Sequence, residues 1–373
     1  MLDYRVYALS TLLVANEGVH VSALTDKNIV DVEEIFTPRE LRREIPITPR
    51  QETVVGKFRK TIEDILDGRD PRLLAVVGPC SVHDILSATE FASRLSALAH
   101  ELSDSLFIVM RVYFEKPRGT SGWSGLLNDP FLDGGFQAEE GLRVARKFLM
   151  HLVRMSLPAA TEALDPIMPQ YLGDLFSWMA IGQRASESNA HREMASGLSM
   201  PIGFKNAPGK DGIEVAAKSI RTASRPHAFL GLSDDGMTAV MKTRGNSYAH
   251  LVLRGGNGPN YGRMSIGRAE ETLTKAGLAR RIVVDCGHAN AEDDPRNQEE
   301  VIHDILSQIE SGNTSIVGFM LEGFLAWGCQ SISPDPDKMD YGVSVTDSCI
   351  DWETTERLLR EAADRFSRVV ADH

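Results

Sequence analysis

The chain has 373 residues, and its 40 basic and 52 acidic side chains give a formal net charge of −12. Phosphate polymers and anionic lipids repel an acidic chain, and no basic stripe is visible, so general binding to nucleic acid or to a membrane surface is excluded. With 42% apolar and 25% charged residues, the composition is that of a globular protein and excludes the disordered and fibrous classes.

The cysteines and the first residues indicate a cytoplasmic protein. Four scattered cysteines are too few for a disulfide framework, and no C-x-x-C pair predicts a structural zinc site. The apolar stretch at residues 6–15 is too short to span a bilayer, and Asp3 offsets Arg5 where a signal peptide would be basic.

Residues 1–50 differ from the rest of the chain. A short apolar run is followed by a charged stretch that Pro38, Pro46 and Pro49 interrupt, so no helical period is visible. We expect an arm that packs on another surface, with a disordered tail as the alternative, and a second domain over residues 51–373.

From residue 73 onward, eight short apolar or β-branched runs alternate with longer segments of helical period. The runs cover residues 73–78, 106–114, 159–162, 178–182, 201–205, 250–254, 281–285 and 315–322. Helix-like segments include residues 85–102, 139–155, 213–222, 299–309 and 351–368. Strands buried on both faces need crossover helices, so this pattern predicts an α/β fold, a (β/α)₈ barrel.

Two further runs, 227–232 and 238–242, predict a β-hairpin inserted near residues 227–243, before the sixth barrel strand. Alternatively, this hairpin replaces one of the barrel strands. A doubly wound open sheet is the competing fold, but no G-x-G-x-x-G turn follows the first strand.

Cations end or follow most of the predicted strands. They are Arg111, Lys116, Arg118, Arg184, Lys205 and Arg254. In a barrel, the C-terminal ends of the strands meet at one mouth, where barrel enzymes carry their active sites. Six positive charges there repel one another unless an anion lies among them, so we expect a small substrate with several negative charges. For any single cation, a surface salt bridge is the alternative.

Four other strand-end side chains carry metal-ligand chemistry. They are Cys80, His288, Glu322 and Asp347. One sulfur, one nitrogen and two oxygen donors suit Mn²⁺, Fe²⁺, Co²⁺ or Zn²⁺ better than Mg²⁺ or Ca²⁺. Taken alone, Cys80 would be an inert core thiol, His288 a hydrogen-bonded core histidine and Asp347 a helix cap.

Nine sequence blocks together resemble the type I 3-deoxy-D-arabino-heptulosonate 7-phosphate (DAHP) synthases, from about Asp31 to the C-terminal helix. The blocks are GPCSVHD (78–84), RVYFEKPRG (111–119), GWSGLLNDP (122–130), TEALDPIMPQY (161–171), AIGQRASES (180–188), HREMASGLSMPIGFKN (191–206), HLVLRGG (250–256), DCGHAN (285–290) and YGVSVTDSCI (341–350). The resemblance implies a metal-dependent condensation of phosphoenolpyruvate with erythrose 4-phosphate, at the start of the shikimate pathway.

The resemblance also implies roles for these residues. Cys80, His288, Glu322 and Asp347 would bind the metal. Phosphoenolpyruvate would be held by Arg111, Lys116, Arg184, Lys205 and Arg254. The aldose phosphate would be held by Arg118 and Ser199, with Pro117 in the same substrate-binding group. Lys116 is expected to donate a proton, with its pKa lowered by burial among cations, and Glu162 to position a water.

Several positions depart from the family pattern. Gly119 stands where a Thr or Ser hydroxyl usually follows the KPR triplet, and Gly323 and Phe324 follow Glu322 where ESH or ESN is usual. At residues 285–288 the chain has DCGH where the family usually has DFSH or DCSH. Two alternatives therefore stay open, a sibling synthase that takes another aldose phosphate in a specialised pathway and a catalytically silent regulatory homologue.

In the family, the N-terminal arm and the hairpin build an aromatic amino-acid effector site across a subunit interface. Gln170 and Gly231 are the residues of this chain that we expect at such a site. Gly231 replaces the Ser of phenylalanine-inhibited forms and would leave room for a tyrosine hydroxyl. We expect a homodimer or homotetramer, and the altered N-terminus leaves an unregulated enzyme as the alternative.

Overall fold

The computed structural model describes residues 26–116, 122–333, 335 and 338–371. Contacts divide the chain into two units between Ile35 and Phe36, and all that follows concerns the second unit. In the described ranges, no helix is both long and apolar enough to cross a membrane.

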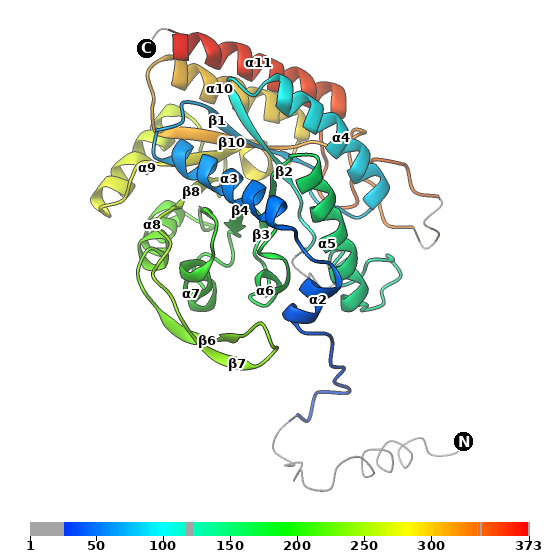
Figure 1. Cartoon of the computed structure of the whole chain (residues 1–373). Coiled ribbons are helices and arrows are strands. Elements are labelled where there is room, and N and C mark those ends of the chain that lie inside the picture. The colour runs from blue at the N-terminus through cyan, green and yellow to red at the C-terminus, as the bar shows by residue number, and fades with distance from the viewer. Residues whose placement is uncertain (1–25, 117–121, 334, 336–337, 372–373) are drawn as a thin grey trace, which may run out of the picture. The chain divides into compact units, whose positions relative to one another are not determined.

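Eight parallel strands close into a barrel, which confirms the predicted (β/α)₈ fold (Figure 1). In chain order they are β1 (Leu73–Gly78), β2 (Leu106–Arg111), β3 (Ala159–Glu162), β4 (Trp178–Ile181), β5 (Ile202–Lys205), β8 (Ala249–Leu253), β9 (Ile282–Asp285) and β10 (Ile316–Glu322). Around the barrel the order is β1-β10-β9-β8-β5-β4-β3-β2, so each strand lies beside its neighbour in the chain and β10 pairs with β1. The predicted runs match these strands closely because uninterrupted apolar runs are what a strand buried on both faces requires.

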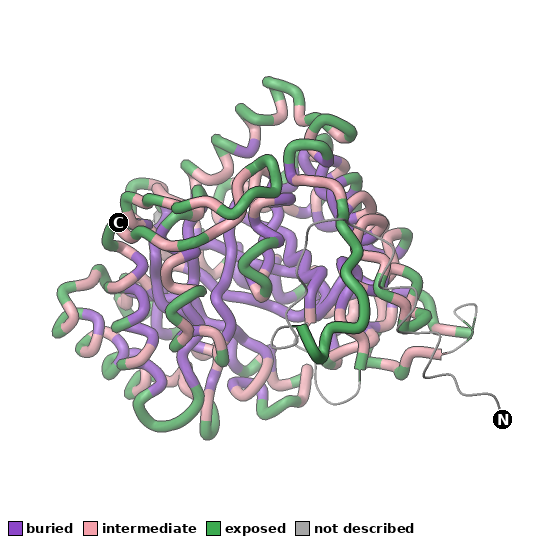
Figure 2. Tube along the Cα trace, turned by 90° about the horizontal axis from the view of Figure 1, so that it is seen from below, coloured by how far each residue is buried: buried purple, intermediate pink, exposed green. Residues whose placement is uncertain are grey.

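Helices follow the strands and cover the outside of the barrel. They are α4 (Ile85–Glu101), α5 (Ala138–Arg154), α6 (Met168–Leu172), α7 (Asn189–Gly197), α8 (Gly212–Ala223), α9 (Arg263–Lys275), α10 (Gln298–Glu310) and α11 (Trp352–Ala371). Alternate strand residues face opposite ways, with Leu74 and Val76 in the inner cluster and Ala75 and Val77 in the cluster shared with the helices. The strands therefore form the buried centre of the molecule, which is purple in Figure 2.

Two helices lie at the end of the predicted arm of residues 1–50, the first within it and the second beginning at its last two residues. They are α2 (Pro38–Glu44) and α3 (Pro49–Leu66). Pro38 and Pro49 begin these helices, and Thr37 and Thr48 close capping boxes with Glu40 and Gln51. Proline is favoured in the first turn, so these residues start helices rather than break them.

Helix α3 closes the N-terminal end of the barrel. Its buried Ile62, Ile65 and Leu66 join the inner cluster. Arg59 donates to the carbonyl of Phe176, just before β4, at 2.9 Å. The opposite, C-terminal end of the barrel is therefore left for a site.

The inserted hairpin of β6 (Ala228–Leu232) and β7 (Thr238–Lys242) forms a separate two-stranded sheet, as predicted. Its turn is tied to α2, because Arg39 pairs with Asp235 at 2.9 Å and Arg42 with Asp234 at 2.6 Å. These contacts connect the start of the second unit to the hairpin.

Candidate active site

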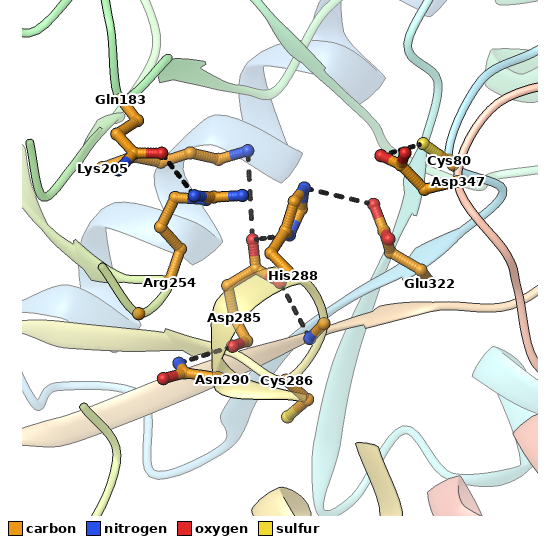
Figure 3. Close-up of polar contacts among 12 residues, drawn as sticks. Cys80, Gln183, Lys205, Arg254, Asp285, Cys286, His288, Asn290, Glu322 and Asp347 are labelled. Carbon is orange, nitrogen blue, oxygen red and sulfur yellow. Dashed lines mark hydrogen bonds and ion pairs between the residues drawn. The ribbon is translucent and has the colours of Figure 1, made fainter. Parts of the chain in front are cut away.

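A sulfur and two carboxylates meet at the C-terminal mouth of the barrel (Figure 3). Ligand atoms of Cys80, Glu322 and Asp347 all lie within 4.8 Å of one another. Cys80 follows β1, Glu322 ends β10 and Asp347 precedes α11, so the closure of the barrel brings them together. These separations and this donor set fit a divalent transition metal, whose bonds to sulfur and oxygen are about 2.0–2.3 Å long.

His288 lies beside this group but outside the 4.8 Å cluster. Its Nε2 is 3.6 Å from Glu322 Oε1, and its Nδ1 is 2.9 Å from Asp285 Oδ2. The residue has a φ of 57°, which is uncommon for a non-glycine residue. A carboxylate on one ring nitrogen directs the other nitrogen toward a ligand, so Asp285 orients His288 toward Glu322.

Asp285 itself is fully buried and was missed by the sequence reasoning. Burial would raise the pKa of Asp285, but the charges of His288 and Lys205 hold it well below its ordinary value. Lys205 Nζ lies 3.9 Å from its Oδ2. The signal for Asp285 was its position three residues before His288 at the end of a strand.

Arg111 and Lys205 are buried cations, 1% and 3% exposed. Arg111 pairs with Glu322 at 2.6 Å, and Lys205 pairs with Glu162 at 3.0 Å. Burial lowers the pKa of Lys205, but the charge of Glu162 and smaller contributions from Tyr113 and Asp285 together raise it above its ordinary value, so the ammonium stays charged. Arg111 Nη1 is buried without a hydrogen-bond partner among the described residues, which leaves one donor for a ligand.

Lys116 Nζ donates to Cys80 Sγ at 2.9 Å. Burial lowers the pKa of Lys116, but the facing Cys80 thiolate, with a smaller contribution from Glu322, raises it above its ordinary value. The expectation of a lowered pKa is therefore wrong, because Lys116 lies next to anions as well as cations. Burial also raises the pKa of the Cys80 thiol.

The remaining predicted cations lie differently. Arg254 donates to Gln183, and its backbone amide donates to the buried Asn206 side chain at 2.9 Å. Arg184 is exposed, in the loop after β4. Pro117 and Arg118 lie outside the described residues.

A cavity of about 770 Å³ lies between the hairpin and the segments around α6 and α7. The predicted effector residues Gln170 and Gly231 both line it. Ser199 lines this cavity too, in the segment that leads into β5, whereas Lys205 ends the same strand. The structure therefore brings Ser199 to the hairpin cavity and not to the cations of the mouth.

Fold and site together define a class of protein, a β/α-barrel enzyme with a cationic mouth and a metal-ligand set. Residues 44–360 match the model of the DAHP synthetase I family, and the chain belongs to this family.

Curated relatives and a solved structure agree with this assignment. The Tyr-sensitive phospho-2-dehydro-3-deoxyheptonate aldolase of Escherichia coli K12 is 52% identical over 340 residues, which cover 91% of this chain and 95% of the relative. The Phe-sensitive enzyme of the same organism is 48% identical over 340 residues, which cover 91% of this chain and 96% of that relative. The solved structure of a phospho-2-dehydro-3-deoxyheptonate aldolase from Francisella tularensis SCHU S4 matches with a TM-score of 0.87 and 41% identity, covering 90% of this chain and 98% of that one.

Proposed function

We propose that this protein condenses phosphoenolpyruvate with D-erythrose 4-phosphate and water to give DAHP and inorganic phosphate, the first step of the shikimate pathway. One observation carries the proposal beyond family membership. The Cys80, Glu322 and Asp347 ligand atoms, within 4.8 Å of one another, lie directly beside the buried Arg111 and the half-buried Lys116. A metal-ligand set and anion-binding groups are thus available to the same reacting molecules.

In this proposal Cys80, His288, Glu322 and Asp347 hold a divalent ion, Mn²⁺, Fe²⁺, Co²⁺ or Zn²⁺. When bound, such an ion would act as a Lewis acid on the aldehyde oxygen of the aldose.

The chain's own residues bind the anions and move protons. The carboxylate and phosphate of phosphoenolpyruvate are held by Arg111, Lys116, Arg184, Lys205 and Arg254. Arg118 and Pro117 are assigned to the aldose phosphate. C3 of phosphoenolpyruvate bonds to the aldehyde carbon, and Lys116, an ammonium at neutral pH, gives a proton to the aldehyde oxygen. Glu162 positions the water that adds at C2, after which the C–O bond to phosphate breaks.

Phosphate release tests the reaction and its acceptor. The Mn²⁺-loaded protein should release phosphate from phosphoenolpyruvate only when erythrose 4-phosphate is also present. Release with arabinose 5-phosphate but not with erythrose 4-phosphate would favour a sibling synthase. This alternative is considered because Gly119 replaces the Thr or Ser that is usual in the family. No release with any aldose would favour a silent homologue.

The ligand assignment is tested with two buried thiols. C80A should abolish both turnover and Mn²⁺ retention. C286A is the matched control, because Cys286 is equally buried and its sulfur points away from the ligand group (Figure 3). Full activity in C80A would contradict the assignment.

We also infer that the hairpin cavity takes an aromatic amino acid, with tyrosine favoured at Gly231. The volume of about 770 Å³ and the apolar Phe229, Leu232 and Met241 in its lining support a ring-bearing ligand. A homodimer or homotetramer and a cytoplasmic location remain predictions from the sequence.

A further inference from the structure

Tyr113 lies beneath the cationic mouth, two residues after the end of β2. Its side chain is 3% exposed and belongs to the inner barrel cluster with Trp178, Val252 and Met320. The next residue, Phe114, faces the opposite way and packs against Phe148 at a centroid distance of 6.3 Å. The Tyr113 ring therefore separates the apolar inside of the barrel from the charged groups above it.

Three cations of the mouth lie around this one ring. The guanidinium carbon of Arg111 is 3.8 Å from the ring centroid, Lys205 Nζ is 5.4 Å away and Lys116 Nζ is 5.7 Å away. All three distances fall within the range of about 6 Å over which an aromatic ring attracts a cation. The attraction is strongest for desolvated groups, and both Arg111 and Lys205 are buried.

The shortest polar contact of each cation is with a different group. Arg111 pairs with Glu322, Lys116 with Cys80 and Lys205 with Glu162. The ring of Tyr113 is a contact that all three cations share, and the Glu162 carboxylate is the charge that acts on all three. The ring attracts positive charge without accepting a conventional hydrogen bond, so it occupies none of their N–H groups, and Arg111 Nη1 stays without a partner among the described residues.

We propose that Tyr113 is a positioning residue for phosphoenolpyruvate, whose ring holds Arg111, Lys116 and Lys205 at the spacing that the anion needs before it binds. The inference rests on the proposed function. Like charges that are held together in advance bind an anion more tightly, because binding then spends less free energy on ordering them. The Tyr113 hydroxyl has no hydrogen-bond partner among the described residues, so the ring carries this role.

The test measures phosphoenolpyruvate affinity by titration calorimetry on Mn²⁺-loaded protein, with KM and kcat beside it. Y113L should weaken phosphoenolpyruvate binding about tenfold, the size expected for losing a buried cation–ring attraction. KM for phosphoenolpyruvate should rise with it, while kcat and Mn²⁺ affinity change less than twofold. Y113F keeps the ring and should bind like the wild type, and F114L is the control for losing a neighbouring buried ring.

A second series keeps the shape of the ring and so avoids a folding defect. Tyr113 is replaced by phenylalanine with one, two or three ring fluorines, which withdraw charge from the ring face. Affinity for phosphoenolpyruvate should fall with each fluorine, whereas a flat series would overturn the proposal.

Other outcomes separate this inference from the function on which it rests. A loss in Y113F as large as in Y113L would assign the effect to the hydroxyl and overturn the role of the ring. Equal phosphoenolpyruvate affinity in all variants would overturn only the role of Tyr113. If the wild-type protein itself does not bind phosphoenolpyruvate, the proposed function fails and this inference fails with it.

Discussion

Glu115 is a buried carboxyl group directly beside Lys116. Its side chain is 9% exposed, and Oε2 has no hydrogen-bond partner among the described residues. Burial raises the pKa of Glu115 to about 8, and the nearby charges of Asp165 and Glu162 add to the effect. Glu115 is therefore neutral at pH 7, so it does not add a further negative charge beside Glu162.

The raised pKa predicts that Glu115 destabilises the fold as pH rises. Between pH 4.5, the ordinary value, and pH 8, the folded chain keeps a proton that the unfolded chain has lost, so the free energy of unfolding falls across this window. E115Q removes the titration and should stabilise the protein at pH 8.5 by up to about 5 kcal/mol, with little effect at pH 4.5. Urea unfolding of both proteins at the two pH values checks this, and an equal difference at both would contradict it.

At the scale of elements, the loop after β10 is fitted closely against α11. The Gly323 amide donates to the carbonyl of Gly78 at 3.1 Å, and the Phe324 amide donates to that of Ile350 at 2.9 Å. A Cβ atom at Gly323 would overlap Thr355 Oγ1, and Thr355 is fully buried in the first turn of α11. The glycine that departs from the family pattern is thus required by its packing against α11.

We predict that G323S destabilises the protein by about 1–3 kcal/mol, as overpacking does in a buried contact. T355A should relieve the overlap, so the double variant should be more stable than the sum of the single effects predicts. Thermal unfolding of the four proteins in this cycle measures the coupling. G267S is the control, because nothing lies within 4 Å of a Cβ at Gly267, and additive effects at 323 and 355 would contradict the packing argument.

At the scale of the whole molecule, the hairpin cavity and the metal-ligand group are distinct sites on one barrel. Ser199 lines the cavity before β5 begins, and Lys205 stands at the other end of the same strand. The hairpin is held by α2 through Arg39 and Arg42. Regulation through the cavity would therefore have to act across the barrel.

We predict that L-tyrosine lowers the rate of phosphate release more than L-phenylalanine or L-tryptophan does. A Cβ at Gly231 would lie 2.7 Å from Met241 Cγ, so G231S narrows the cavity and should weaken tyrosine inhibition more than phenylalanine inhibition. Rates with and without each amino acid, compared as ratios for both proteins, give the measurement. No inhibition by any of the three would support an unregulated enzyme instead.

Much of the fold and part of the site were predictable from the chain itself. The eight strands and the hairpin were predictable, because strands buried on both faces require uninterrupted apolar runs and the hairpin requires a short polar turn between two such runs. The start of α3 was not predictable, because a proline such as Pro49 breaks a helix when it lies in the interior but is favoured in the first turn. Cys80, His288, Glu322 and Asp347 were proposed as metal ligands from their strand-end positions and from resemblance. The one signal for Asp285 was its place at a strand end before His288, and Tyr113 carried none.

The sequence by itself therefore determined the barrel, the excess of cations at the strand ends and the types of metal-ligating side chain, since all of these depend on local order and periodicity. The tertiary structure decided which groups face one another. Only barrel closure brings Cys80 to Asp347 at 3.2 Å, places Lys116 Nζ 2.9 Å from Cys80 Sγ, and brings Ser199 to the hairpin cavity. Distances and desolvation control these interactions, and neither is set until strands far apart in the chain pair with one another.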